Sequence, residues 1–300
     1  MARHPLLQLA LPSLAVLLAG CGRLGELNTS PPVTPEQWCT LRPCVDVGDI
    51  VLNEPSSTAL VFLLAALWVA SGVYFLVTAR AQTSRRWLGI ALVLGGIGAA
   101  QAGVSYQAFS YALKCAGRDV CLLTSGWEVG YSITQAVSVS AMLVAVAYAC
   151  SAGRLRRVLC WYAAFNVVVY LVVSLIGVMA PSRMLLSFEV LLLFALPGII
   201  IVIALAARRY RADHQPLDRS LLLTAVLLVV VQVAYYAYYA AGITALLWKD
   251  GTGIYFSEND VLHVGMILWL SYVVIVVGKH LRDLTQSACR PSTASSPEAQ

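Results

Sequence analysis

The sequence predicts an all-α membrane protein: a seven-transmembrane helix bundle preceded by a lipoprotein-type signal segment. Of its 300 residues, 59% are hydrophobic and only 12% are charged, about half of the roughly 25% that is usual in soluble domains. So few charges cannot cover a soluble globule of this size, whereas they suit a bundle whose outer surface meets lipid. The net charge of +5 does not indicate nucleic-acid binding, because the basic residues lie in short clusters between apolar segments.

The first 21 residues are expected to be a signal peptide with a lipobox. Residues 1–4 form a short basic region, and residues 6–18 form an apolar run that is too short for an ordinary membrane span. The tetrapeptide that ends at Cys21 (LAGC) resembles a bacterial lipobox, in which Cys21 becomes the lipidated first residue of the mature chain. The alternative is an uncleaved signal anchor with Cys21 as an ordinary thiol. In both cases the chain is exported from residue 22 onwards.

Three further regions follow the signal segment. Residues 22–56 are rich in Pro, Thr and Asp without a periodic apolar face, so they are expected to be an exported polar linker that rests on the membrane through Trp38. Residues 57–280 are expected to form the seven-helix transmembrane domain. Residues 281–300 are expected to be a cytoplasmic disordered tail, because most of them are polar or small.

Seven apolar stretches are each long enough to cross a hydrocarbon core of about 30 Å. They cover residues 57–79, 87–111, 127–150, 158–180, 183–207, 220–247 and 259–279. Thirteen basic residues lie in one set of the alternating connections, from Arg80 to Arg290, and six lie in the other set, from Arg23 to Lys249. Positive residues favour the cytoplasm, so a bacterial inner (cytoplasmic) membrane location is expected, with the N-terminus exported and the C-terminus cytoplasmic.

The cysteines are consistent with that topology. Four of them fall in segments expected to be exported, where disulfides persist: Cys39, Cys44, Cys115 and Cys121. Four cysteines allow three pairings. The local pairs Cys39–Cys44 and Cys115–Cys121 are favoured, and the rival is a cross-link between the N-terminal segment and the connection after the second span.

Few ionisable residues lie at membrane depth, where each one costs free energy and therefore points to a function. Glu128 opens the third span, Glu189 lies about two turns into the fifth, and His263 lies just over one turn into the seventh. Ser105 lies at a similar depth in the second span. We expect Ser105, Glu128, Glu189 and His263 to share one polar chamber on the exported side. Ser257 and Asp260 are expected to form a capping box at the start of the seventh helix.

The arrangement of these residues resembles that of the alkaline ceramidases and the adiponectin and progestin receptors, a superfamily of seven-transmembrane hydrolases. Three segments carry the resemblance: GVSYQAF at 103–109, WEVGY at 127–131 and NDVLH at 259–263. The family implies a zinc-dependent hydrolase site, but its other histidine positions are occupied by Phe109 and Asn259. Only a mixed zinc site is compatible with these residues, with His263, Glu128 and Glu189 as candidate ligands.

Two classes of function follow from these residues. The first is a non-catalytic sensor or scaffold that binds a lipid or small amphiphile in the polar chamber. The second is a membrane-embedded hydrolase of lipid amides or esters, with Ser105, Glu128, Glu189 and His263 as catalytic residues. Membrane lipids are the expected partners in both cases, and nucleic acid is not. A proton-coupled transporter is less favoured, because few polar residues continue into the inner halves of the helices.

Overall fold

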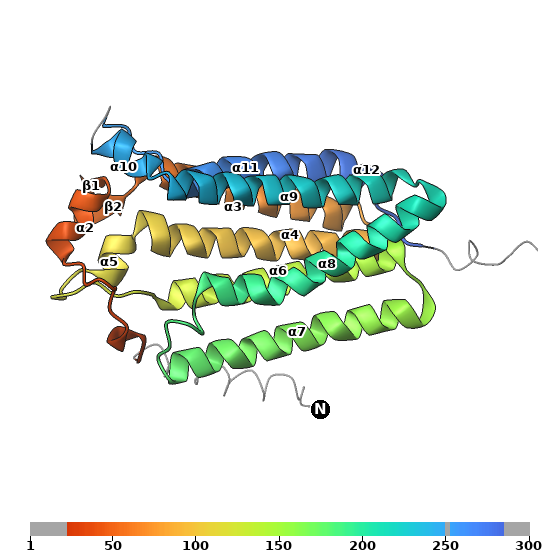
Figure 1. Cartoon of the computed structure of the whole chain (residues 1–300), viewed down its shortest axis with the longest axis horizontal. Coiled ribbons are helices and arrows are strands. Elements are labelled where there is room, and N and C mark those ends of the chain that lie inside the picture. The colour runs from red at the N-terminus through yellow and green to blue at the C-terminus, as the bar shows by residue number, and fades with distance from the viewer. Residues whose placement is uncertain (1–22, 250–252, 285–300) are drawn as a thin grey trace, which may run out of the picture.

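The computed structural model describes residues 23–249 and 253–284 (Figure 1). The predicted signal segment with its lipidated Cys21 lies outside the described residues, and so does the predicted tail beyond residue 284.

Within the described residues, seven helices are long and apolar enough to cross a membrane, which confirms the predicted all-α seven-helix bundle. The long helices are α3 (Pro55–Val77), α4 (Thr83–Ala102), α6 (Gly126–Cys150), α7 (Gly153–Met179), α8 (Phe188–Asp213), α9 (Pro216–Ala240) and α11 (Glu258–Tyr272). Short π-helices extend α4 and α11, namely η2 (Gly103–Ala108) and η3 (Val273–Val277), and α12 (Gly278–His280) completes the last span.

The bundle has two chemically different ends. The small elements α2 (Pro35–Leu41), β1 (Cys44–Val47), β2 (Ile50–Asn53), α5 (Ser110–Lys114) and α10 (Ile243–Trp248) gather at one end (Figure 1). Both disulfides lie there, so we call it the disulfide end. The opposite end, which we call the arginine end, carries Arg80, Arg85, Arg86, Arg154, Arg156, Arg157, Arg208, Arg209, Arg211 and Arg219.

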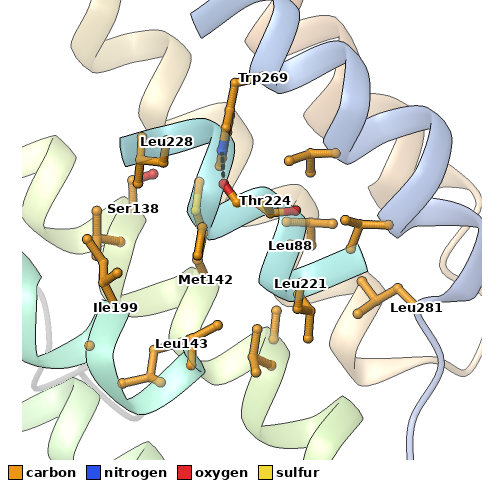
Figure 2. A pocket seen from close by; sticks show the side chains of 18 of the residues that line it. Leu88, Ser138, Met142, Leu143, Ile199, Leu221, Thr224, Leu228, Trp269 and Leu281 are labelled. Carbon is orange, nitrogen blue, oxygen red and sulfur yellow. Dashed lines mark hydrogen bonds between the residues drawn. The ribbon is translucent and has the colours of Figure 1, made fainter. Parts of the chain in front are cut away.

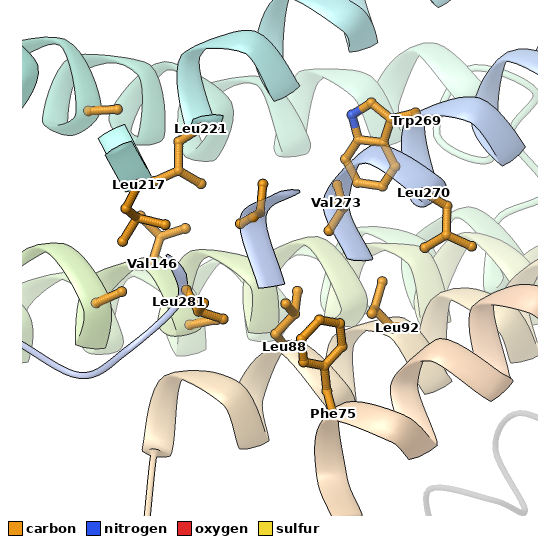
Figure 3. Close-up of a cluster of buried hydrophobic side chains, with 14 of the residues drawn as sticks. Phe75, Leu88, Leu92, Val146, Leu217, Leu221, Trp269, Leu270, Val273 and Leu281 are labelled. Atoms are coloured by element: carbon orange, nitrogen blue, oxygen red, sulfur yellow. The ribbon is translucent and has the colours of Figure 1, made fainter. Parts of the chain in front are cut away.

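The helices pack around α4 and α6. Glycines allow α3 to approach α4 closely: a Cβ on Gly72 would lie 2.7 Å from the carbonyl oxygen of Gly89, and a Cβ on Gly96 would lie 2.8 Å from that of Ala65. Close contact between small residues is a main source of helix association in lipid. Buried side chains of α3, α4, α9, α11 and η3 fill the interior next to this contact, including Phe75, Leu92 and Val273 (Figure 3).

Residues 23–54 differ from the expected linker, because they fold into a cap on the disulfide end. The cap contains a 3₁₀ turn η1 (Arg23–Glu26), α2 and the antiparallel hairpin β1–β2. A capping box between Thr34 and Gln37 starts α2. The backbone of the cap also pairs with the connection after α5. The amide of Thr29 donates to the carbonyl of Cys121 at 2.9 Å, and the amide of Leu123 donates to the carbonyl of Leu27 at 2.7 Å.

Trp38 of the cap does not rest on the membrane as expected. Its side chain is buried, and it packs against the disulfide between Cys115 and Cys121. The guanidinium of Arg42 stacks on the indole ring at 4.1 Å from its centre. The cap is therefore anchored to the protein by its own aromatic residue.

The favoured cysteine pairing is confirmed. Disulfides join Cys39 to Cys44 in the cap and Cys115 to Cys121 after α5, with sequence separations of 5 and 6 residues. Each disulfide therefore lies within one segment, and neither links the cap covalently to the bundle. Two cysteines in the described residues, Cys150 and Cys160, remain free thiols.

Candidate functional site

Ser105 and Glu128, which were predicted to share a site, are in direct contact. The Ser105 hydroxyl donates to Glu128 Oε1 at 2.8 Å, and it lies 2.6 Å from the Ser125 hydroxyl. Ser105 lies in the π-helical turn η2, a type of irregularity that is frequent at functional sites. Ser125 is the residue before α6, and Glu128 lies in the first turn of that helix, where a negative charge interacts favourably with the helix dipole.

Lys114 completes this group. Its ammonium forms an ion pair with Glu128, and both residues are almost fully buried, with exposed fractions of 4% and 5%. The same ammonium lies 4.9 Å from the centre of the Tyr106 ring, a second favourable contact for a buried cation. The carboxylate is therefore neutralised where it is buried, as the desolvation cost of a buried charge requires.

The hydrogen bonds of this group fix the direction of its hydroxyls. Because Ser105 gives its only proton to Glu128, the short contact with Ser125 requires the Ser125 hydroxyl to donate to Ser105. The result is a chain of donors from Ser125 through Ser105 to the carboxylate. We call Ser105, Lys114, Ser125 and Glu128 the serine–glutamate cluster.

A recess at the disulfide end reaches one member of the cluster. Its volume is about 550 Å³, and its walls include Ser125, Arg118 and Trp127 together with Leu24 and Gly25 of the cap. Ser105 and Glu128 lie deeper and do not line it. Only the Ser125 end of the donor chain is therefore next to this opening.

The other two predicted site residues lie apart from the cluster. Glu189 lies in the first turn of α8 and is exposed on the surface of the bundle. His263 is buried in α11, and its Nδ1 has no hydrogen-bond partner in the described residues. None of the four residues of the expected chamber lines this recess or the apolar cavity between the helices.

The donor set does not fit a zinc ion. In residues 23–249 and 253–284, no three His, Cys, Asp or Glu side chains gather closely enough to hold a metal. A zinc site normally takes at least three protein ligands, and the candidates His263, Glu128 and Glu189 do not converge. The Glu128 carboxylate is instead engaged by Lys114 and Ser105.

A second group of acidic residues joins the cap to α3 and α11. Glu54 is buried at the residue before α3 and pairs with Arg42 of the cap at 3.1 Å. In α11, Asp260 Oδ2 accepts hydrogen bonds from the Ser57 hydroxyl at 2.9 Å and from the Ser257 amide at 2.6 Å. The predicted capping box of Ser257 and Asp260 is thereby confirmed. The sequence did not predict this contact, because both Glu54 and Arg42 lie in the segment that was expected to be a linker.

The interior of the bundle contains an apolar cavity that the sequence did not predict (Figure 2). Its volume is about 230 Å³, and its walls come from α3, α4, α6, α8, α9, α11 and the turns after α11. Aliphatic and thioether side chains form most of the lining, including Leu88, Met142, Leu143, Ile199, Leu221, Leu228 and Leu281. It extends from mid-bundle towards the arginine end, because Leu88, Leu221 and Leu281 lie near the helix ends there.

Most polar groups around the cavity are already bonded to the helices. The Ser138 hydroxyl donates to the Ala91 carbonyl at 2.7 Å, and the Trp269 indole donates to the Thr224 carbonyl at 3.1 Å (Figure 2). Trp68 also lines the cavity and stacks on Trp269 with ring centres 5.9 Å apart. Gly198 lines the cavity from α8, and there is free space beside it: a Cβ there would meet its nearest neighbour, Leu143, only at 3.9 Å. These walls favour an apolar occupant.

The sequence matches no protein-family model and no curated protein.

Proposed function

We propose that this chain is a multi-pass protein of the bacterial inner membrane whose disulfide end is exported and whose arginine end faces the cytoplasm. The distribution of arginine between the two ends supports this orientation. The two disulfides at the opposite end support it independently, since disulfides persist in the oxidising compartment outside the cytoplasm.

Within that membrane, we infer that the protein binds the apolar chain of a lipid or small amphiphile and acts as a sensor or scaffold. The observation that carries this inference is the apolar cavity between the helices. An engineered cavity of about 150 Å³ already binds benzene, whereas pockets for drug-sized ligands hold roughly 300–1,000 Å³. A cavity of about 230 Å³ therefore suits part of one acyl or prenyl chain rather than a whole lipid.

The polar groups near the cavity support binding of an amphiphile there rather than catalysis. Ser138 and Trp269 donate their protons to backbone carbonyls, so neither is free to act as an acid or base. Among the described residues, those that line the cavity include no His, Asp, Glu, Lys or Cys. Its occupant is therefore held by shape and apolar contact.

The test is native mass spectrometry of the protein extracted in a mild detergent. Wild-type protein is expected to retain an amphiphile near one equivalent. Gly198→Phe is expected to lose it, because the new ring points into the cavity, whereas Ile200→Phe on the exposed face of the same helix retains it. Equal retention by both variants, or no bound amphiphile in wild-type protein, would contradict the proposal.

A membrane-embedded hydrolase of lipid amides or esters is the second candidate, and the contact between Ser105 and Glu128 favours it. The contact joins two of the segments that resemble the alkaline ceramidases. The Lys114 ion pair weighs against it, because a general base must accept a proton and this carboxylate is already neutralised. The binding function is therefore the better supported of the two.

Two measurements separate the candidates. A hydrolase releases fatty acid from lipid amides or esters in vesicles and loses that activity in Glu128→Gln. If a metal takes part, elemental mass spectrometry finds near-stoichiometric zinc that is lost in His263→Ala. A binding protein shows neither result, while its retained amphiphile still depends on Gly198.

A further inference from the structure

The junction between the cap and the bundle contains more buried acid than base. Glu54 of the cap faces Arg42 from the end of α2, Tyr255 from the segment before α11, and Glu258 and Asp260 from the first turn of α11. Among these groups only Arg42 carries a positive charge. Three carboxylates therefore face one guanidinium where little water reaches.

Several contacts fix Glu54 in this position. Its side chain is almost fully buried, and Arg42 Nη1 lies 3.1 Å from its Oε1. Its backbone has a φ of 44°, in the left-handed region that a residue with a side chain rarely adopts. Such strained residues persist where the surrounding structure holds them, and they cluster at switches and functional sites.

Asp260 adds a second unbalanced acid. It is fully buried, and its Oδ1 has no hydrogen-bond partner in the described chain, while its Oδ2 accepts all of its bonds. Glu258 is half-buried beside it and accepts a hydrogen bond from Thr244. Loss of the Glu54 proton thus places a further negative charge beside two others.

We propose that Glu54 is a proton-operated latch: the cap closes firmly on α3 and α11 when Glu54 is protonated and loosens when it is deprotonated. The Arg42 guanidinium stays within hydrogen-bond distance of the carboxyl, and the acids of α11 supply the repulsion that deprotonation adds. Because neither disulfide joins the cap to the bundle, the cap is tied to it covalently only through the chain that enters α3. The latch is independent of the occupant of the apolar cavity.

The titration of Glu54 agrees with this geometry. Burial raises the pKa of its carboxyl from 4.5 to about 7, against the opposing effect of Arg42. The docked cap therefore binds the proton more tightly than a detached cap in which Glu54 meets water. By linkage, the added stability is fully present below pH 4.5 and is lost as the pH rises through about 7.

Hydrogen exchange of the hairpin amides tests the latch. In the full-length protein, protection of β1 and β2, corrected for the intrinsic pH dependence of exchange, is expected to fall between pH 6 and pH 8. Glu54→Gln removes this change and leaves the hairpin protected throughout. Glu36→Gln, which changes an exposed acid of the same cap, retains it. Persistence of the change in Glu54→Gln, or its absence in wild-type protein, would overturn the proposal.

Two further variants separate a titrating latch from a merely structural contact. Infrared difference spectra of the Glu54 carboxyl give its midpoint directly. Glu258→Gln removes a neighbouring negative charge and is expected to lower the midpoint, whereas Arg42→Gln removes the positive charge and is expected to raise it, each by about one pH unit. Shifts in the same direction, or no shift in either variant, would refute the assignment.

Discussion

At the scale of single residues, the ion pair of Lys114 and Glu128 is the most constrained feature of the candidate site. Both side chains are buried and have further partners: the Tyr106 and Trp38 rings for the ammonium and the Ser105 hydroxyl for the carboxylate. A buried pair of this kind does not guarantee stability, because the desolvation of two charges opposes their attraction. Its members nevertheless depend on each other strongly.

A double-mutant cycle measures this dependence. Glu128→Leu leaves Lys114 as an uncompensated buried cation, which is expected to destabilise the protein by about 3–5 kcal/mol. The double variant Lys114→Met/Glu128→Leu is expected to recover most of that loss, because both charges are removed together. Chemical denaturation in detergent gives the four free energies of unfolding, and additive effects of the two substitutions would contradict a coupled pair.

At the scale of elements, the contact of α3 with α4 depends on the absence of side chains. Gly72 and Gly89 face each other's backbone so closely that a Cβ on either one would lie within 2.8 Å of the opposite carbonyl oxygen. Backbone cannot move aside as the end of a flexible side chain can. This approach also brings Trp68 of α3 against Gly95 of α4.

Alanine substitutions of two helical glycines are therefore expected to have opposite effects. Gly72→Ala forces α3 away from α4 and is expected to lower the melting temperature, at a cost of about 1–3 kcal/mol. Gly198→Ala has space around its Cβ and is expected to be neutral or to stabilise by up to about 1 kcal/mol through helix propensity. Thermal unfolding of both variants in one detergent makes the comparison, and equal losses would show that the contact is not tight.

At the scale of the whole molecule, the concentration of arginines at the end opposite the disulfides gives the bundle a polarity along its axis. Exposed positions at or beside the short connections can report this polarity without disturbing the disulfides or the arginines. Met184 is exposed near the disulfide end, and Ala212 is exposed near the arginine end.

Thiol labelling tests the proposed orientation. In a variant without Cys160 and Cys289, Met184→Cys is expected to react with a membrane-impermeant maleimide in intact spheroplasts. Ala212→Cys is expected to react only after the membrane is permeabilised. The reverse pattern would place the arginine end outside the cytoplasm.

The features that could be predicted from the sequence depend on local or periodic signals. The seven helices follow from apolar length, the disulfides from short spacing, and the Ser257–Asp260 capping box from a pattern of four residues. Ser105 and Glu128 were expected to share a chamber with Glu189 and His263, because all four lie at similar depth, and the first two are in contact.

The features that were missed depend on how separate segments meet. The cap is held by backbone bonds from Thr29 and Leu27 to the connection after α5, and such bonds leave no pattern in side chains. Lys114 was not predicted as a site residue, because its burial depends on the folded loop that the disulfide of Cys115 and Cys121 closes. The exposed position of Glu189 results from the rotation of α8, which a uniformly apolar helix does not encode. The cavity is a space between several helices, so no single residue or spacing in the sequence predicts it.

The pairing of the cap with residues 121–123 imposes an order on the assembly of the protein. The cap precedes α3 in the chain, whereas its backbone partners Cys121 and Leu123 follow α4 and α5. During synthesis the cap therefore emerges before the two long helices α3 and α4 and the short helix α5, which all precede the segment that completes it. Until then Leu24 and Leu27, which pack with Val129 in the finished protein, have no surface to cover them. The nascent cap is thus a natural client for a chaperone during this interval.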